Sequence, residues 1–205
     1  AAEKLFLEKG FAMVSTTQIA KAAGCNQALV HYYFRTKDRL FEAIFAEKLK
    51  TFFSVIFQTH DESLPLEEKL KKYIGAHFDM LMANQQLPFL VFNELSTNPA
   101  RIDSLKEMLG STISHVYEPF QKELDAEIDA GRIRPTTVPD IIYSMIALNV
   151  MAFIGAPIMK KILVLNDDFF NLMLMHRKEE NIRIIINSLK PDVEIQPEKK
   201  TKKRK

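Results

Sequence analysis

The sequence has little of the material that disulfide-rich or β-rich proteins use. Its single cysteine, Cys25, excludes a disulfide within the chain and suits a reducing compartment, so we expect a cytoplasmic protein. It has six glycines and no tryptophan, while leucine, isoleucine, methionine, lysine and glutamate are frequent, which predicts an all-α protein. The chain opens on AAEKLFLEKGF, which is amphipathic and charged, unlike a signal peptide. Because this stretch reads as a helix already under way, we expect a few residues before Ala1.

Sequence motifs of catalysis are also missing. The glycines form neither a phosphate-binding loop nor a dinucleotide fingerprint, and no Gly-x-Ser-x-Gly elbow occurs. The five histidines show no paired metal-ligand spacing, and one cysteine does not define a nucleophile with its base. We therefore expect a protein that is not an enzyme and that holds no metal and no cofactor.

A long uncharged run spans residues 141–159, IIYSMIALNVMAFIGAPIM, where 19 positions carry no charge. By length alone this run is a candidate for a membrane span, with Lys160 and Lys161 as its flank. Tyr, Ser, Asn, Gly and Pro within it lower its hydrophobicity, and a helix that is apolar all round can instead be buried on both sides. We favour the buried helix and expect no membrane partner.

Charge is unevenly distributed along the 205 residues. Residues 1–50 hold 8 Lys and Arg against 5 Asp and Glu, residues 51–190 hold 14 against 18, and residues 191–205 hold 6 against 3. The N-terminal part of the chain, which we call the head, is therefore basic, and the part that follows, which we call the body, is acidic. This indicates a polyanionic partner for the head, although the excess is small. The tail is bounded by proline and basic, so we expect it to be flexible; it either adds DNA affinity or is only a solvated end.

The first 46 residues predict a helix-turn-helix. A first helix ends at Gly10, Ser15 caps a helix over residues 16–23, Gly24 supplies the turn, and Asn26 caps a helix over residues 27–34. A further helix begins near Lys37 and continues to Phe57, joining head to body. The positions predicted to face the core of the head are Ala2, Leu5, Phe6, Ile19, Ala20, Ala23, Val30, Phe34, Leu40, Phe41, Ile44 and Phe45.

If Val30 and Phe34 point inward, the polar side chains of QALVHYYF point outward. Glutamine forms paired hydrogen bonds with adenine, and His and Tyr bond phosphates or base edges. Lys37 and the threonines at 16 and 17 lie in the first turns of helices, where side chain and backbone N–H together suit a phosphate. The plainer interpretations are a core tyrosine with a hydrated hydroxyl, a surface histidine, and a Cys25 that fills the turn instead of sensing redox state.

The segment GFAMVSTTQIAKAAGCNQALVHYYFRTKDRLF resembles the DNA-binding signature of the tetracycline-repressor (TetR) family of bacterial regulators. This resemblance implies a two-fold dimer, a recognition helix in the major groove and a C-terminal ligand-sensing domain. His31 stands where the family usually has Tyr, and Leu29 where a smaller or hydroxylated residue is common, which affects the base preference. Carried over by position, the base-facing group is Gln27, Ala28, Leu29, His31 and Tyr32, and the phosphate group is Thr16, Thr17, Tyr33 and Lys37.

The body, residues 47–190, reads as helices throughout. One helix starts after Pro65, and Pro88 should kink or divide it. Asn98-Pro99 should begin a short helix that Gly110 interrupts, and a longer helix should follow over residues 113–130. The resemblance implies that the helix of the uncharged run and the helix over residues 167–189 pack against a second copy. The domains expected are therefore residues 1–46, 47–190 and the tail 191–205.

Large apolar side chains with sparse polar ones suggest a cavity for a hydrophobic or amphipathic small molecule in the body. Ordinary core packing is the plainer interpretation of each such residue. The candidates are His77, Phe78, Leu81, Phe89, Phe92, Asn93, Tyr117, Phe120, Tyr143, Met145 and Asn149.

Together these features predict a ligand-responsive transcriptional regulator. We expect a repressor that binds a palindromic operator as a homodimer and is released by a small effector. The alternative is a ligand-independent DNA-binding regulator whose C-terminal domain serves only dimerisation or partner contact. A fully packed interior would favour the alternative, and an elongated apolar cavity would favour the sensor.

Overall fold

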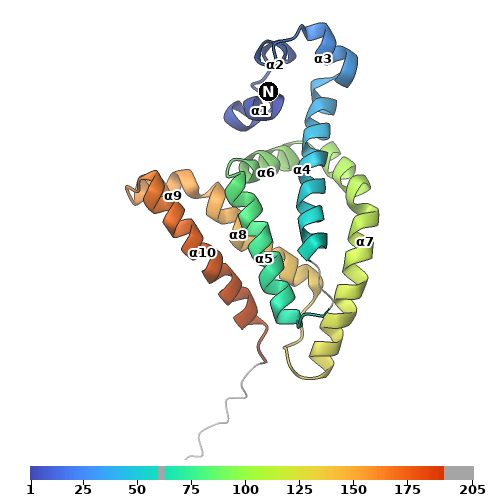
Figure 1. The fold of residues 1–205 in the computed structure, drawn as a ribbon, viewed down its shortest axis with the longest axis vertical. Helices are drawn as coiled ribbons and strands as arrows, with labels where there is room; N and C mark the ends of the chain where they lie inside the picture. The colour runs from blue at the N-terminus through green and yellow to red at the C-terminus, as the bar shows by residue number, and fades with distance from the viewer. Residues whose placement is uncertain (60–62, 192–205) are drawn as a thin grey trace, which may run out of the picture.

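The computed structural model is all-helical, as predicted (Figure 1). It describes residues 1–59 and 63–191, apart from the side chains of residues 49–59, 104–105, 108–109 and 111–116. The tail prediction therefore falls outside the described residues. The helices are α1 Ala2–Lys9, α2 Thr16–Ala22, α3 Gln27–Phe34, α4 Lys37–Thr59, α5 Leu66–Ala83, α6 Leu87–Thr97, α7 Pro99–Asp129, α8 Val138–Ile154, α9 Ala156–Ile162 and α10 Asp167–Ser188.

Local capping signals place the helices of the head. Ser15 accepts a hydrogen bond from the backbone N–H of Gln18, whose side chain accepts one from the Ser15 backbone N–H, a reciprocal capping box. The Asn26 side chain caps α3, and Gly24 in the turn has φ +68°. The predicted inward residues gather in one core around Phe6, with one exception. Ala23 is exposed because it is the C-cap of α2, where the chain leaves the helical face.

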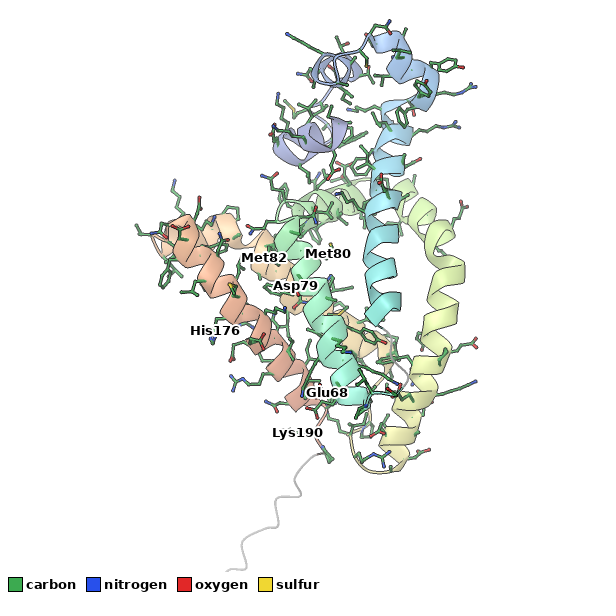
Figure 2. All side chains as sticks on the ribbon, viewed as in Figure 1. Glu68, Asp79, Met80, Met82, His176 and Lys190 are labelled. Atoms are coloured by element: carbon green, nitrogen blue, oxygen red, sulfur yellow. The ribbon has the colours of Figure 1, made fainter. Side chains whose placement is uncertain are left out.

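α4 continues from the head into the body (Figure 1). There it packs against α5, and α5, α8 and α10 pack against one another. Pro88 divides the chain as predicted: α5 ends at Ala83, and Pro88 lies in the first turn of α6, where its missing N–H costs nothing. Gly75 of α5 faces α10, and a Cβ there would lie 3.4 Å from Lys178 Cε, a contact that the lysine side chain can accommodate. Lys178 pairs with Asp79 of α5 at 2.7 Å. Asp79 is labelled on α5 in Figure 2.

The predicted interruption at Gly110 is wrong. α7 runs without a break over 31 residues, through both Gly110 and Pro119. A glycine inside a helix costs only about 1 kcal/mol relative to alanine, which neighbouring turns offset. Gly110 therefore marks a position of low helix propensity within α7 and not the end of a helix.

The uncharged run forms most of α8 and the start of α9. α8 begins at Val138, before the run, where Thr137 accepts a hydrogen bond from the Asp140 backbone N–H. Among the described residues, no single helix is long and apolar enough to cross a membrane; α8 and α9 pass that test only as a pair, which is bent by 53°. The inner face of α8 joins two apolar clusters, one around Leu124 and Ile185 and one around Phe78 and Phe170.

Candidate nucleic-acid interface

α3 presents one exposed face and one buried residue. Val30 is buried against the core of the head, while the six residues predicted to contact DNA from this helix are all exposed. The Tyr32 side chain is 77% exposed, and its ring lies edge-on to that of Tyr33 with centroids 5.2 Å apart. An α-helix with its side chains is about 10–12 Å in diameter, and a B-DNA major groove is about 12 Å wide, so α3 can enter it. The face is Gln27, Ala28, Leu29, His31, Tyr32 and Tyr33.

The two threonines of α2 contact Gln27. The Thr17 hydroxyl donates to Gln27 Oε1 at 3.0 Å, and Gln27 Nε2 donates to the Thr16 hydroxyl at 3.0 Å. We predicted both threonines as phosphate contacts, but in the structure their hydroxyls fix the amide of the neighbouring helix. Gln27 Nε2 also lies 3.3 Å from His31 Nε2, one turn further along α3. Glutamine, histidine and both threonines therefore form one polar group on the exposed side of the head.

The Lys37 ammonium is largely engaged within the head. Its Nζ donates to the backbone oxygens of Phe11 and Val14, both at 2.9 Å, and lies 4.2 Å from the centroid of the Phe11 ring. These bonds fasten the start of α4 to the loop between α1 and α2. The structure therefore gives Lys37 a positioning role that the sequence did not indicate.

Replacing Lys37 by Met should lower the free energy of unfolding by about 1–3 kcal/mol, because two carbonyl groups lose a charged donor. DNA affinity should fall equally for all sequences, because the loop holding α2 loosens. The salt dependence of binding separates this role from a phosphate contact. Loss of a contact to a phosphate would reduce the slope of log K against log salt by about 0.9, whereas a purely positional role leaves the slope unchanged.

Arg101 of α7 connects the body to the head. Its side chain is 5% exposed; Nη2 donates to Asp38 of α4 at 3.0 Å, and Nε lies 3.2 Å from Glu94 Oε2 of α6. The guanidinium carbon lies 4.4 Å from the ring centroid of Phe11 and 4.3 Å from that of Phe41. The sequence carries no signal for this contact, since the residues lie on separate helices and a short loop.

The candidate ligand residues do not gather in one place. Phe78 and Leu81 belong to the cluster around Phe170, and Phe120 and Met145 pack on the cluster around Leu124. Those that the structure leaves exposed are Phe89, Phe92 and Asn93 on α6, Tyr117 on α7 and Tyr143 on α8. The periodicity predicted which residues of each helix are apolar, but these residues pack in different clusters or stay exposed.

His77 and Asn149 do lie together, in a buried polar layer between α5, α8 and α10. The Asn149 amide donates to the Ile74 backbone oxygen at 3.0 Å and lies 3.1 Å from His77 Nδ1, while Asn181 Nδ2 donates to Asn149 Oδ1 at 2.9 Å. Arg177 Nε donates to Asn181 Oδ1 at 2.7 Å. Burial lowers the pKa of His77 from 6.5 to about 4, so the imidazole is neutral at pH 7 and Nδ1 accepts.

This pKa shift predicts a pH dependence of stability. The unfolded chain protonates His77 near pH 6.5 and the folded chain only near pH 4, so the unfolded state binds more protons between these values. Stability should therefore fall as pH drops through this window, by roughly 3 kcal/mol from this residue. Denaturant unfolding at pH 7 and pH 4.5 checks it: His77→Gln should lose less stability than the unmodified chain over the same interval, and equal losses would contradict the assignment.

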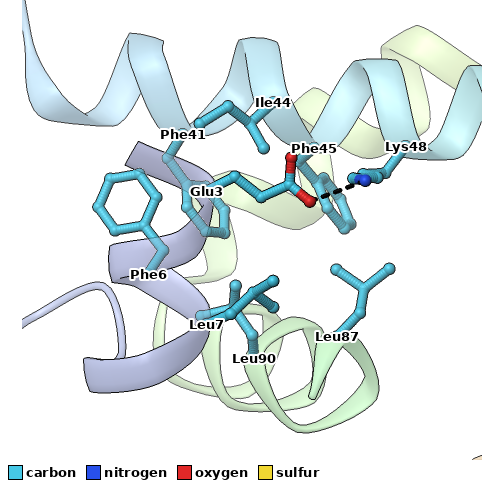
Figure 3. Close-up of a pocket in the computed structure, with 9 residues that line it drawn as sticks. All are labelled: Glu3, Phe6, Leu7, Phe41, Ile44, Phe45, Lys48, Leu87 and Leu90. Carbon is cyan, nitrogen blue, oxygen red and sulfur yellow. Dashed lines mark ion pairs between the residues drawn. The ribbon is translucent and has the colours of Figure 1, made fainter. Parts of the chain in front are cut away.

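A narrow crevice lies where α1, α4 and α6 meet, at the junction of head and body (Figure 3). Phe6, Phe41 and Leu90 form part of its wall, and Glu3 pairs with Lys48 across it at 2.7 Å. Its volume of about 10 Å³ holds no more than one water molecule. None of the candidate ligand residues lines it.

The adjacent helices α8 and α10 leave several large apolar side chains exposed. We call these residues the α8–α10 surface, and Tyr143, which is 77% exposed, is one of them. Exposed large apolar side chains on two neighbouring helices are typical of a contact surface. The α8–α10 surface consists of Ile142, Tyr143, Ile146 and Met151 on α8 and Phe169, Leu172, Met175 and Ile184 on α10.

Comparison with known proteins agrees with these observations. Residues 1–44 match the family model described as bacterial regulatory proteins, tetR family. The fatty acid metabolism regulator protein of Bacillus subtilis is 28% identical over 95 residues, which cover 46% of this chain and 49% of that protein. The match thus spans about half of that relative. In the part of the chain that the structure describes, no group of three or more His, Cys, Asp or Glu could hold a metal ion.

Two solved structures resemble the whole chain. A bacterial regulatory protein in the tetR family from Rhodococcus RHA1 superposes with a TM-score of 0.70 at 15% identity, covering 94% of each chain. The fatty acid degradation regulator FadR from Bacillus halodurans gives a TM-score of 0.65 at 20% identity, covering 92% of this chain and 96% of that one. At this identity the likeness concerns the fold.

Proposed function

We propose that this chain, whose residues 1–44 match the model of the tetR family of bacterial regulatory proteins, is a ligand-responsive transcriptional repressor of that family. It binds a palindromic operator as a homodimer, and a hydrophobic or amphipathic small molecule releases it. The observation that carries the DNA-binding part is the exposed face of α3, which is hydrogen-bonded to α2; an α-helix has the diameter that a major groove accepts.

Dimerisation is supported by the α8–α10 surface. Two copies that bury these residues would form a four-helix contact, and a palindromic operator requires that its two-fold axis place both heads on one side of the assembly. A palindromic operator requires heads about 34–36 Å apart, one turn of DNA. Each chain supplies one short reading helix, so a dimer doubles the length of sequence that is read.

The effector class follows from the apolar body and from the relatives. Two of the compared proteins are regulators of fatty acid metabolism or degradation, which suggests a long acyl chain. Release requires that the effector bind a second arrangement of the body more tightly than the operator-binding one. A coupling of about 1–3 kcal/mol would weaken operator binding roughly 5- to 150-fold.

The alternative, a regulator that senses no ligand, is favoured by two observations. The crevice at the junction of head and body holds no more than one water molecule, and none of the candidate ligand residues lines it. His77 and Asn149, the polar candidates most deeply buried, bond to each other and to neighbouring helices, as structural residues do. Thermal unfolding with and without long-chain fatty acids separates the two functions. A rise in melting temperature together with loss of operator binding supports the sensor, and no change in either supports the alternative.

Replacing Gln27 by Ala should weaken operator discrimination, with loss of the base preference at the position that Gln27 contacts, and leave dimerisation intact. The measurement is selection from a random duplex library at fixed salt, followed by sequencing, with the unmodified chain and the variant in parallel. The unmodified chain should enrich a palindrome; salt-sensitive binding without an enriched sequence would contradict sequence-specific regulation. An unchanged palindrome with Gln27→Ala would remove Gln27 from the base-reading set.

A further inference from the structure

The Gln27 amide is already hydrogen-bonded in the free protein. Its two amide hydrogens point to the Thr16 hydroxyl and to His31 Nε2, and its oxygen accepts from Thr17. Within the described part of the chain this uses both donors of the amide and one of the two acceptor positions of Oε1. The remaining capacity of the group is therefore to accept.

His31 decides which way the amide is turned. His31 Nδ1 lies 3.1 Å from the backbone oxygen of Arg35, which only accepts, so Nδ1 carries the ring hydrogen. In the neutral imidazole Nε2 then has no hydrogen and accepts, so it faces the amide nitrogen and not the amide oxygen. The threonine hydroxyls do not make this choice, since a hydroxyl both donates and accepts. Arg35 holds this carbonyl in place at the end of α3, where its φ is +61°.

We propose that His31 is a positioning residue that orients the Gln27 amide as a hydrogen-bond acceptor, and this proposal rests on the proposed DNA-binding function. In the major groove adenine N6 and cytosine N4 donate, whereas the corresponding positions of guanine and thymine accept. Gln27 therefore selects adenine or cytosine on the contacted strand. This differs from the usual paired contact of glutamine with adenine, which would require an amide hydrogen to leave His31 or Thr16.

The selected operators of the full-length chain test the base preference directly. One position in each half-site should hold adenine or cytosine in preference to guanine or thymine by roughly 2- to 10-fold, the value of one hydrogen bond. A position that holds adenine alone would contradict the proposal, because it would show the paired contact.

Two variants distinguish an orienting role of His31 from a purely structural one. His31→Phe keeps a ring of similar size and removes the acceptor, so the preference at that position should fall to less than roughly 2-fold. Thr17→Val removes one bond to the amide oxygen but leaves His31 in place, so the preference should keep its direction even if affinity falls. Equal loss in both variants, or retention in His31→Phe, would overturn the role of His31.

The test of His31 can fail while the proposed DNA-binding function holds, because the two failures give different results. Both side chains are exposed, and a circular dichroism melt of each variant shows whether the fold is kept. If the unmodified chain enriches no sequence, DNA reading itself fails. If it enriches a palindrome in which no position prefers adenine and cytosine, only the orientation by His31 fails.

Discussion

Replacing Arg101 by Met is expected to lower the free energy of unfolding by about 3–5 kcal/mol, because it leaves a buried carboxylate without a counter-charge. Glu94 is 5% exposed and lies within 3.2 Å of the guanidinium. The substitution also removes the cation from Phe11 and Phe41, a contact worth about 1 kcal/mol at such sites. The pair with Asp38 adds little, since that carboxylate is well hydrated.

Urea unfolding of the full-length protein measures this loss, and two controls show its cause. The double variant Arg101→Met with Glu94→Gln should recover part of the stability, because the uncompensated charge is gone. Arg132→Met removes an exposed partner of Glu127 and should change stability by less than about 1 kcal/mol. A loss for Arg101→Met as small as that for Arg132→Met would show that the head–body junction does not depend on this residue.

Replacing Asn149 by Leu should cost about 3–5 kcal/mol, since one substitution removes three hydrogen bonds from a buried polar layer. The Ile74 backbone oxygen, His77 Nδ1 and the Asn181 amide each lose a hydrogen bond, and each unsatisfied group costs about 1–3 kcal/mol. Asn149 and Asn181 are fully buried, so water does not replace the lost bonds.

Denaturant unfolding compares this variant with Asn187→Ala, which changes an exposed asparagine on α10 and should stay within about 0.5 kcal/mol of the unmodified chain. The double variant Asn149→Leu with Asn181→Leu should be less damaging than the sum of the two single variants, because both members of the Asn149–Asn181 bond become apolar. Strict additivity would contradict the idea that the layer acts as one unit.

The head was predictable from sequence because its signals are local. Ser15 with Gln18, Gly24 and Asn26 each act within a few residues, so they fix the two helices and the turn before any tertiary contact forms. The exposed face of α3 followed from the spacing of buried and polar residues on a helix of eight positions. What the spacing did not reveal is that the threonines of α2 are bonded to Gln27.

The body was predictable only as helices. Periodicity gives the apolar face of each helix, but which helix covers it depends on the tertiary arrangement, so the candidate ligand residues separated into two clusters and an exposed group. Arg101 and Glu94 carried no signal because charged residues near helix ends are ordinarily solvated. Their burial results from the meeting of α6, α7 and the head.

α4 is a single helix of 23 residues, which makes it about 35 Å long. If α4 tilts by about 5° about its C-terminal end in the body, its N-terminal end next to α3 moves by roughly 3 Å. This is close to the 3.4 Å rise of one base pair along a DNA strand. In a dimer the two heads would shift in opposite senses, which doubles the change in their separation. A change of packing too small to disturb the core of the body is therefore large enough to put the two reading helices out of step with the grooves.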